Sequence, residues 1–341
     1  MTIMNQQPPS KSASKKNFLY RLWKYFDKKE YVSLTGYKIH ACLSEKLKKQ
    51  GVISSSSNLK LKKYRYVYET LLHPKPLLPP FVPKTIFDQF FRKFFCLQLR
   101  ENTVETLVLG SSHGFYGYTA DDARHEVNIC TSSQDLYCSY ELYKRYAHAP
   151  CLKNIVLFYS VFSPGLITEV TSDAVFIDLL HFFFDVPYRF TFEREKEELF
   201  RNLAFVAAEE KEKYKDFNYT GNCSYDFFMP METSVESRVQ SHLKNNGRNN
   251  NQTEYVRKLV KAVGQNNQKL LIVVPPCRSD YFKLLPSFEE LFPDLLSLKD
   301  DVRIVSFLND GDFSDADFGD MDHLNKNGAG ILTEKIRNYL S

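Results

Sequence analysis

A series of short apolar runs, separated by helical stretches, most strongly constrains the fold of this chain. The runs begin at residues Thr106, Glu126, Asn154, Lys269 and Val302. Several of them lack an alternation of apolar and polar residues, which is typical of strands buried on both faces. Strands that alternate with helices predict an α/β fold with a doubly wound, mostly parallel five-stranded sheet flanked by helices.

The helical stretches between these runs are marked by charge and periodicity. One is expected to open at Ser133, a longer charged helix covers residues 193–216, and the last covers residues 325–340. In a doubly wound sheet, binding and catalytic groups gather beyond the carboxyl ends of the strands. The ends of the predicted strands are therefore the places to look for chemistry.

The chain of 341 residues divides into three regions by composition. Residues 1–16 are polar and predict a disordered leader. Residues 17–84 predict a basic helical N-terminal region that ends in a proline-rich linker. Residues 85–341 predict the α/β domain, with an insertion at about 165–265.

Charge and cysteine usage exclude several classes of protein. A net charge of +4 is small for this length, so no nucleic-acid partner is expected. The seven cysteines form no CxxC pair, which favours reduced thiols in the cytoplasm over disulfides or a zinc site. No segment approaches a run of about eighteen apolar residues. The basic helix near residues 18–28 could rest on an anionic membrane surface, although packing against the main domain is the favoured interpretation.

The first predicted strand runs directly into small polar residues, in the sequence TLVLGSSHGFYGY. An ordinary turn would explain Gly110, but a serine at the tip of a central strand can also present its hydroxyl to a cleft. Ser112 is the candidate nucleophile under this second interpretation. His113, directly after it, is expected to shape the cleft rather than to act as the base.

A second block near the C-terminus reads Asp320-Met321-Asp322-His323 and is followed by a helix. An aspartate three residues before a histidine can hold one ring nitrogen and leave the other as a general base. A serine nucleophile needs that geometry. The surrounding aspartates lack the order of an EF-hand loop, so no metal is expected.

With these two blocks, the chain resembles the SGNH, or GDSL-like, hydrolase superfamily over about residues 104–341. The resemblance implies that Ser112 is the nucleophile, that His323 is the general base, and that Asp320 orients His323. It also implies an SGNH-like α/β fold and ester chemistry without a cofactor.

Two other blocks depart from the superfamily pattern. The second block, VNICTSSQDL, has no glycine, and the third, LFYSVFSPG, has no asparagine to donate to an oxyanion. Losing one such donor typically costs about a hundred- to a thousandfold in rate. The candidates for oxyanion or substrate contacts are Gly110, Thr131, Gln134, Ser160, Arg238 and His242.

The leading hypothesis is a serine-dependent acyl-ester enzyme that forms an acyl-serine intermediate, either an esterase or an O-acyltransferase. Acylated carbohydrate is the expected substrate by analogy with the superfamily, and a transferase would need an acyl donor such as acetyl-CoA. One alternative is a catalytically degenerate carbohydrate-binding or scaffold protein with the same fold. Another, less favoured because the chain has no Walker A or GxGxxG motif, is phosphoryl chemistry with magnesium on the aspartate-rich loop.

Overall fold

The computed structural model describes residues 82, 84–171, 175–190, 200, 202–204, 206–208, 233–247 and 252–341. The predicted leader at 1–16, nearly all of the basic region at 17–84 and most of the predicted helix at 193–216 lie outside these residues. The chain forms two compact units: Met1–Ile86 with Arg194–Lys213, and Phe87–Glu193 with Tyr214–Ser341. The sheet and the candidate site belong to the second unit.

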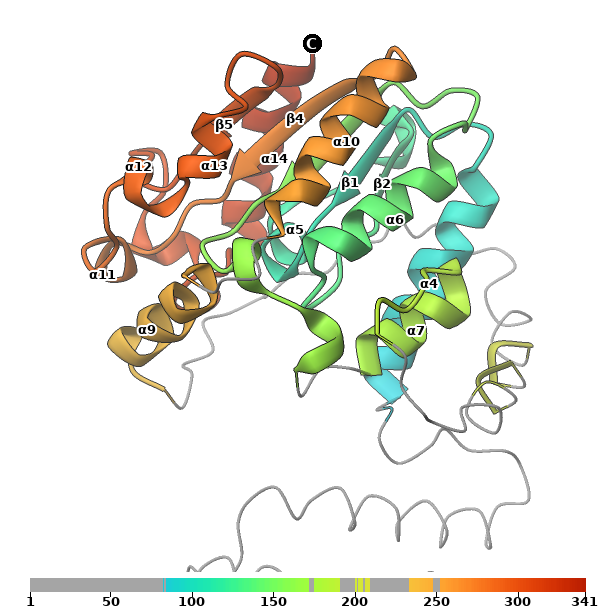
Figure 1. The fold of residues 1–341 in the computed structure, drawn as a ribbon, viewed down its shortest axis with the longest axis horizontal. Coiled ribbons are helices and arrows are strands. Elements are labelled where there is room, and N and C mark those ends of the chain that lie inside the picture. The colour runs from blue at the N-terminus through green and yellow to red at the C-terminus, as the bar shows by residue number, and fades with distance from the viewer. Residues whose placement is uncertain are drawn as a thin grey trace, which may run out of the picture. The chain divides into compact units, whose positions relative to one another are not determined.

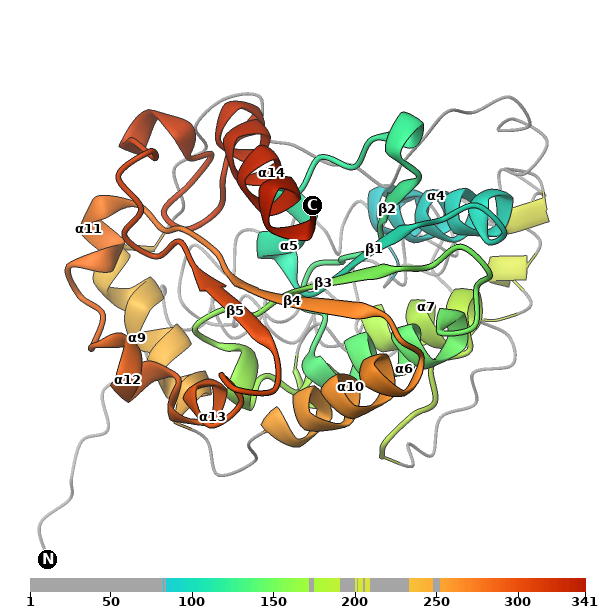
Figure 2. The same cartoon turned by 90° about the horizontal axis from the view of Figure 1, so that it is seen from above.

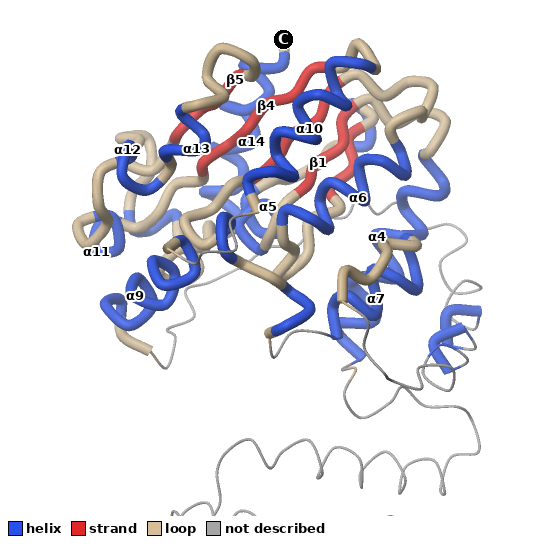
Figure 3. The backbone as a smooth tube through the Cα atoms, viewed as in Figure 1, coloured by secondary structure: helices blue, strands red, loops and turns tan. Residues whose placement is uncertain are grey.

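The predicted α/β fold is confirmed, with helices around a central sheet (Figures 1 and 3). Every strand of this sheet is parallel to its neighbours. The five strands lie in the order β2-β1-β3-β4-β5. Their bounds are β1 Thr106–Leu109, β2 Glu126–Asn128, β3 Asn154–Phe158, β4 Lys269–Val274 and β5 Arg303–Ser306. The first strand, β1, lies inside the sheet. The chain adds β2 on one side of β1 and then β3, β4 and β5 on the other side, which is the doubly wound topology.

The strand register brings the carboxyl ends of the strands to one edge. Leu109 of β1 pairs with Leu157 of β3, and Phe158 pairs with Val273 of β4. The central strands are buried along most of their length, whereas the edge strand β5 is partly exposed. The segments that follow β1, β3 and β5 therefore meet at this edge, far apart in sequence but close in space.

Helices cover both faces of the sheet (Figure 2). Helices α5 and α14 lie on one face and α6 and α10 on the other, where α10 packs against α6 and β4. The α-helices are α4 Lys84–Arg100, α5 Ser112–Gly117, α6 Leu136–Tyr146, α7 Val175–Phe184, α9 Val235–Asn246, α10 Thr253–Gln265, α11 Ser279–Phe282, α12 Phe288–Leu291, α13 Pro293–Leu296 and α14 Lys326–Leu340. The short 3-10 helices are η2 Asp122–Arg124, η3 Ser163–Gly165, η4 Thr168–Val170 and η5 Asp315–Asp317.

Two helix predictions compare directly with the structure. Helix α14 follows its cap residue Asn325, as predicted for residues 325–340. The prediction that a helix opens at Ser133 is wrong, because Ser133 has a φ of 56° and Asp135 caps α6 through the amide of Cys138. A left-handed residue cannot start a right-handed helix, so the chain turns once more before α6 begins.

The segment predicted as an insertion, residues 165–265, ends in α10. Because α10 connects β3 to β4 and packs on the sheet, it acts as the crossover helix that parallel strands require. Within the described residues, no helix is both long and apolar enough to cross a membrane.

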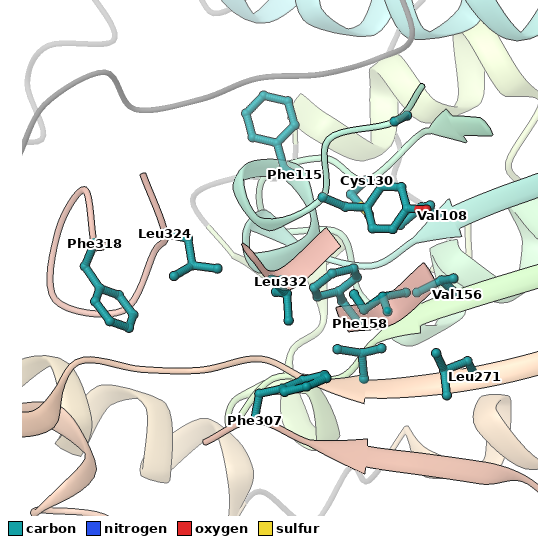
Figure 4. Close-up of a cluster of buried hydrophobic side chains, with 14 residues drawn as sticks. Val108, Phe115, Cys130, Val156, Phe158, Leu271, Phe307, Phe318, Leu324 and Leu332 are labelled. Atoms are coloured by element: carbon teal, nitrogen blue, oxygen red, sulfur yellow. The ribbon is translucent and has the colours of Figure 1, made fainter. Parts of the chain in front are cut away.

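The core behind the site lies between the sheet and helices α5 and α14 (Figure 4). Phe158 of β3 is buried in it and lies near Leu332 of α14. Gly110 passes so close to Phe158 that a Cβ on Gly110 would lie 2.7 Å from the Phe158 Cβ. Gly110 also has a φ of 135°, which only glycine adopts without strain. This glycine therefore fixes the turn that delivers Ser112.

Gly110→Ala is expected to lower the free energy of unfolding by about 3 kcal/mol, because the new methyl group meets backbone and adds conformational strain. Gly330→Ala is the matched control, since Gly330 lies in α14 with no atom near its added Cβ. We expect Gly330→Ala to be neutral or stabilising by up to about 1 kcal/mol. Urea unfolding of both variants measures the difference, and equal stability would contradict the role given to Gly110.

Candidate active site

Ser112 is the first residue of α5 and follows β1 after a two-residue turn. The side chain of Asn128, at the end of β2, holds α5 in place. Its Nδ2 donates hydrogen bonds to the carbonyls of Gly114 and Tyr118, each at 2.9 Å, and its Oδ1 accepts from the amide of Cys130 at 3.0 Å. Ser112 itself is half-buried at the carboxyl edge of the sheet.

The loop before α14 folds around the carboxylate of Asp320. Its Oδ1 accepts hydrogen bonds from the amides of Asp322 and His323 at 3.0 and 2.8 Å. Gly319 donates its amide to the carbonyl of His323 at 2.8 Å, which closes the loop. The second oxygen of Asp320 lies 2.8 Å from His323 Nδ1. Local backbone bonds thus place the imidazole on its carboxylate.

Ser112, His323 and Asp320 form a continuous hydrogen-bonded chain. His323 Nε2 lies 2.8 Å from Ser112 Oγ, so the contact predicted between residues 211 positions apart is present. Because Asp320 accepts from Nδ1–H, Nε2 is the ring nitrogen that accepts the hydroxyl hydrogen of Ser112. The structure therefore contains a Ser-His-Asp arrangement at the carboxyl edge of a parallel sheet, with a buried His323 and Asp320 and a half-buried Ser112.

The charges around His323 favour a basic imidazole. Burial by itself lowers the pKa of His323, but the carboxylates of Asp322 and Asp320 outweigh it and raise the pKa above its ordinary value. Burial opposes ionisation of Asp320, yet its hydrogen bond to His323 holds the pKa of this carboxyl below its usual range. At neutral pH, Asp320 is therefore ionised and can stabilise an imidazolium.

A second Ser-His-Asp chain lies beside the first. His113 Nδ1 is 2.7 Å from Ser160 Oγ, and His113 Nε2 is 3.2 Å from Asp322 Oδ2. The rings of His113 and His323 lie 4.8 Å apart between centroids. The sequence pattern gave no signal for a role of Asp322 and predicted only a shaping role for His113, although both residues belong to the predicted blocks.

Accessibility separates the two serines. Ser160 is 1% exposed, whereas Ser112 is half-buried, so a substrate can reach Ser112 more readily. Burial lowers the pKa of His113, which keeps its ring neutral. With its one N–H directed at Asp322, His113 accepts the Ser160 hydrogen at Nδ1. In this arrangement the Ser160 hydrogen is directed at His113 and not at an oxyanion.

Thr131 and Gln134 are brought beside the Ser112 turn, but their side chains bond to other protein groups. The amide of Thr131 donates to the carbonyl of Gly110 at 3.3 Å, and Thr131 Oγ1 donates to Gln134 Oε1 at 3.2 Å. Gln134 Nε2 donates to Ser139 Oγ at 3.0 Å. These bonds join the loop after β2 to the turn and to α6. The substrate contacts expected of both side chains stay a prediction.

Helix α9 places Arg238, His242 and Asn246 on one face at a spacing of four residues. Arg238 donates two hydrogen bonds, each 3.1 Å, to the two oxygens of Asp322. His242 Nδ1 lies 2.6 Å from the hydroxyl of Tyr281, and burial lowers the pKa of His242 to about 3. Arg238 and His242 thus fasten α9 to the segments around it through Asp322 and Tyr281. The substrate contacts expected of both residues stay a prediction.

Ligand-type atoms of His113, Asp322 and His323 lie within 4.8 Å of one another, a spacing that a metal ion could use. Both oxygens of Asp322 already accept from Arg238, whose positive charge would repel a cation. The His323 ring nitrogens contact Ser112 and Asp320. These donors therefore fit proton transfer better than metal binding.

The aspartate-rich loop holds its carboxylates with protein donors. Asp310 accepts from Lys335, Asp315 from Ser279, and Asp317 from Ser314. The aspartates of this loop therefore have a structural role: they hold in place the loop that carries His323.

No protein-family model matches the chain, and no curated protein matches it either. The fold and the site together define a parallel α/β protein with a buried Ser-His-Asp arrangement at the carboxyl edge of its sheet. Any closer assignment depends on the chemistry of that arrangement.

Proposed function

We propose that this chain is a serine-dependent acyl-ester enzyme of the SGNH-like type, with Ser112 as nucleophile. The hydrogen-bonded chain from Ser112 through His323 to Asp320, with both contacts at 2.8 Å, is the observation that carries the proposal. The resemblance of its two sequence blocks to the superfamily and the doubly wound parallel sheet support it.

The proposed reaction begins when Ser112 Oγ attacks the ester carbonyl while His323 Nε2 takes its proton. Asp320 stabilises the imidazolium that forms. The amide of Ser112 is the first in α5 and has no acceptor within the helix, so it can donate to the oxyanion. His323 then returns the proton to the leaving alcohol, and acyl-Ser112 remains.

The acceptor decides whether the enzyme hydrolyses or transfers. Water, activated by His323, would release an acid and regenerate Ser112. A sugar hydroxyl in the same place would produce a new ester, because the triad removes a proton from either acceptor. We propose an acylated carbohydrate as the substrate and hydrolysis as the reaction.

Product partitioning tests this proposal. Wild-type protein is expected to hydrolyse p-nitrophenyl acetate without added sugar, and addition of candidate glycans should leave acetate as the main product. Chromatography of the products measures the ratio of acetate to acetylated glycan. A rise in turnover when glycan is added, with acetylated glycan as the product, would show that the enzyme transfers the acyl group and does not hydrolyse it. No turnover with any ester would support the alternative, a carbohydrate-binding protein without catalysis.

A further inference from the structure

Asp322 is a buried carboxylate at which several parts of the site meet. It is 1% exposed and accepts two hydrogen bonds from Arg238 of α9. His113 Nε2 of α5 lies 3.2 Å from its Oδ2, and His323 Nδ1 lies 3.9 Å from its Oδ1. Three segments distant in sequence therefore converge on one negative charge that the reaction scheme above does not use.

We propose that Asp322 is a positioning residue for the Ser112 site, whose carboxylate, clamped by Arg238 and His113, is a second negative charge favouring the protonated form of His323. The proposal rests on the function proposed above, because it assigns how the base of that reaction is tuned. Asp320 supplies the direct hydrogen bond to His323, whereas Asp322 acts through space at 3.9 Å. In a site shielded from water, a charge at that distance has a large effect.

Arg238 sets the strength of this effect. Its guanidinium compensates the buried charge of Asp322 and also opposes protonation of His323. Removing Asp322 and removing Arg238 should therefore change the basicity of His323 in opposite directions. Two substitutions that merely loosened the packing would instead lower activity together.

The Asp322 carboxylate is also connected, through other side chains, to the turn that carries Ser112. His113 contacts Asp322 through Nε2 and Ser160 through Nδ1, which lies 2.7 Å from Ser160 Oγ. Ser160 Oγ in turn lies 3.3 Å from Ser111 Oγ. Ser111 is the cap residue of α5 and directly precedes Ser112. The hydrogen bonds from Asp322 thus end behind the turn that carries the reactive hydroxyl.

The groups that face His323 and Asp322 come from all the elements packed against them. From α5 they are Ser112, His113 and Tyr116; from α9, Arg238 and His242; from the segment after β4, Cys277 and Tyr281; and from their own loop, Asp320. Burial raises the pKa of the Cys277 thiol and of the Tyr281 hydroxyl, which keeps both neutral. Asp320, Asp322 and Arg238 are therefore the charges that tune His323 at neutral pH.

The test compares Asp322→Asn, Arg238→Gln and the double variant with wild type. Two readouts are followed across pH: kcat/KM for p-nitrophenyl acetate, and the NMR titration of isotope-labelled His323, assigned with His323→Gln. A general base must be neutral, so activity falls as pH drops through the pKa of His323, which lies above the ordinary 6.5. We expect Asp322→Asn to move this acidic limb down by about one pH unit and Arg238→Gln to move it up.

The double variant removes both charges. The acidic limb of its pH profile is expected to lie between those of the two single variants. Asp310→Asn is the matched control, because Asp310 lies on the same acidic loop, bonds to Lys335 and should leave the limb unmoved. If Asp322→Asn fails to fold, Arg238→Gln and the double variant still give the sign. Shifts of the same sign in both single variants, or an unmoved His323 titration, would overturn the proposal. If wild type shows no esterase activity but the His323 titration moves as expected in the variants, the proposed function is rejected and the role of Asp322 is kept.

Discussion

Ser112→Ala is expected to reduce ester turnover by about 10⁵-fold or more while leaving the fold intact. Ser112 Oγ lies 2.8 Å from His323 Nε2, so the substitution removes the proposed nucleophile itself. Because Ser112 is half-buried, replacing its hydroxyl by hydrogen should change the free energy of unfolding little. Steady-state hydrolysis of p-nitrophenyl acetate and thermal unfolding measure the two effects.

The neighbouring serines are the controls for this prediction. Ser111→Ala and Ser160→Ala each remove a hydroxyl behind the turn, and we expect losses of about tenfold or less from the lost hydrogen bond. If Ser160→Ala were as damaging as Ser112→Ala, or if Ser112→Ala kept its activity, the nucleophile would have to be reassigned.

Asp320→Asn is expected to lower kcat by about 10⁴-fold. The Asp320 carboxylate accepts from His323 Nδ1 and from two amides. An asparagine can keep the amide contacts through its oxygen, but its NH₂ would then face Nδ1 and favour the wrong tautomer. His323 Nε2 would carry the hydrogen and could no longer accept a proton from Ser112.

The size of this loss distinguishes the two aspartates. Asp322→Asn leaves the hydrogen bond between Asp320 and His323 in place, so its loss in kcat should be much smaller. Measuring kcat for both variants at a pH above the acidic limb removes the contribution of protonation. Equal losses would show that the direct hydrogen bond is not the decisive contact.

The sequence predicted the sheet well because buried strands leave a clear pattern. Each apolar run became a strand, and the small residues after Thr106–Leu109 marked the turn to α5. The start of α6 could not be read in the same way. Ser133 is a good cap residue by composition, and its left-handed φ of 56° depends on contacts formed only in the fold.

The sequence also predicted the hydrogen bonds from Ser112 through His323 to Asp320. Asp320 and His323 are three residues apart, so their contact is a local property that the sequence can reveal. The chain through His113 was missed, because it joins the turn after β1, the end of β3 and the loop before α14. The two bonds from Arg238 to Asp322 were missed for the same reason. An arginine in sequence does not reveal that a buried aspartate will accept both of its hydrogen bonds.

Labelling with a fluorophosphonate probe, followed by peptide mapping, tests the proposed nucleophile most directly. The probe reacts with a serine whose hydroxyl is activated by a base, so the wild-type protein should carry one adduct, on Ser112. The adduct should persist in Ser111→Ala and Ser160→Ala, form far more slowly in His323→Gln, and vanish in Ser112→Ala. An adduct on Ser160 or another serine, or no adduct on folded wild-type protein, would contradict the proposed function.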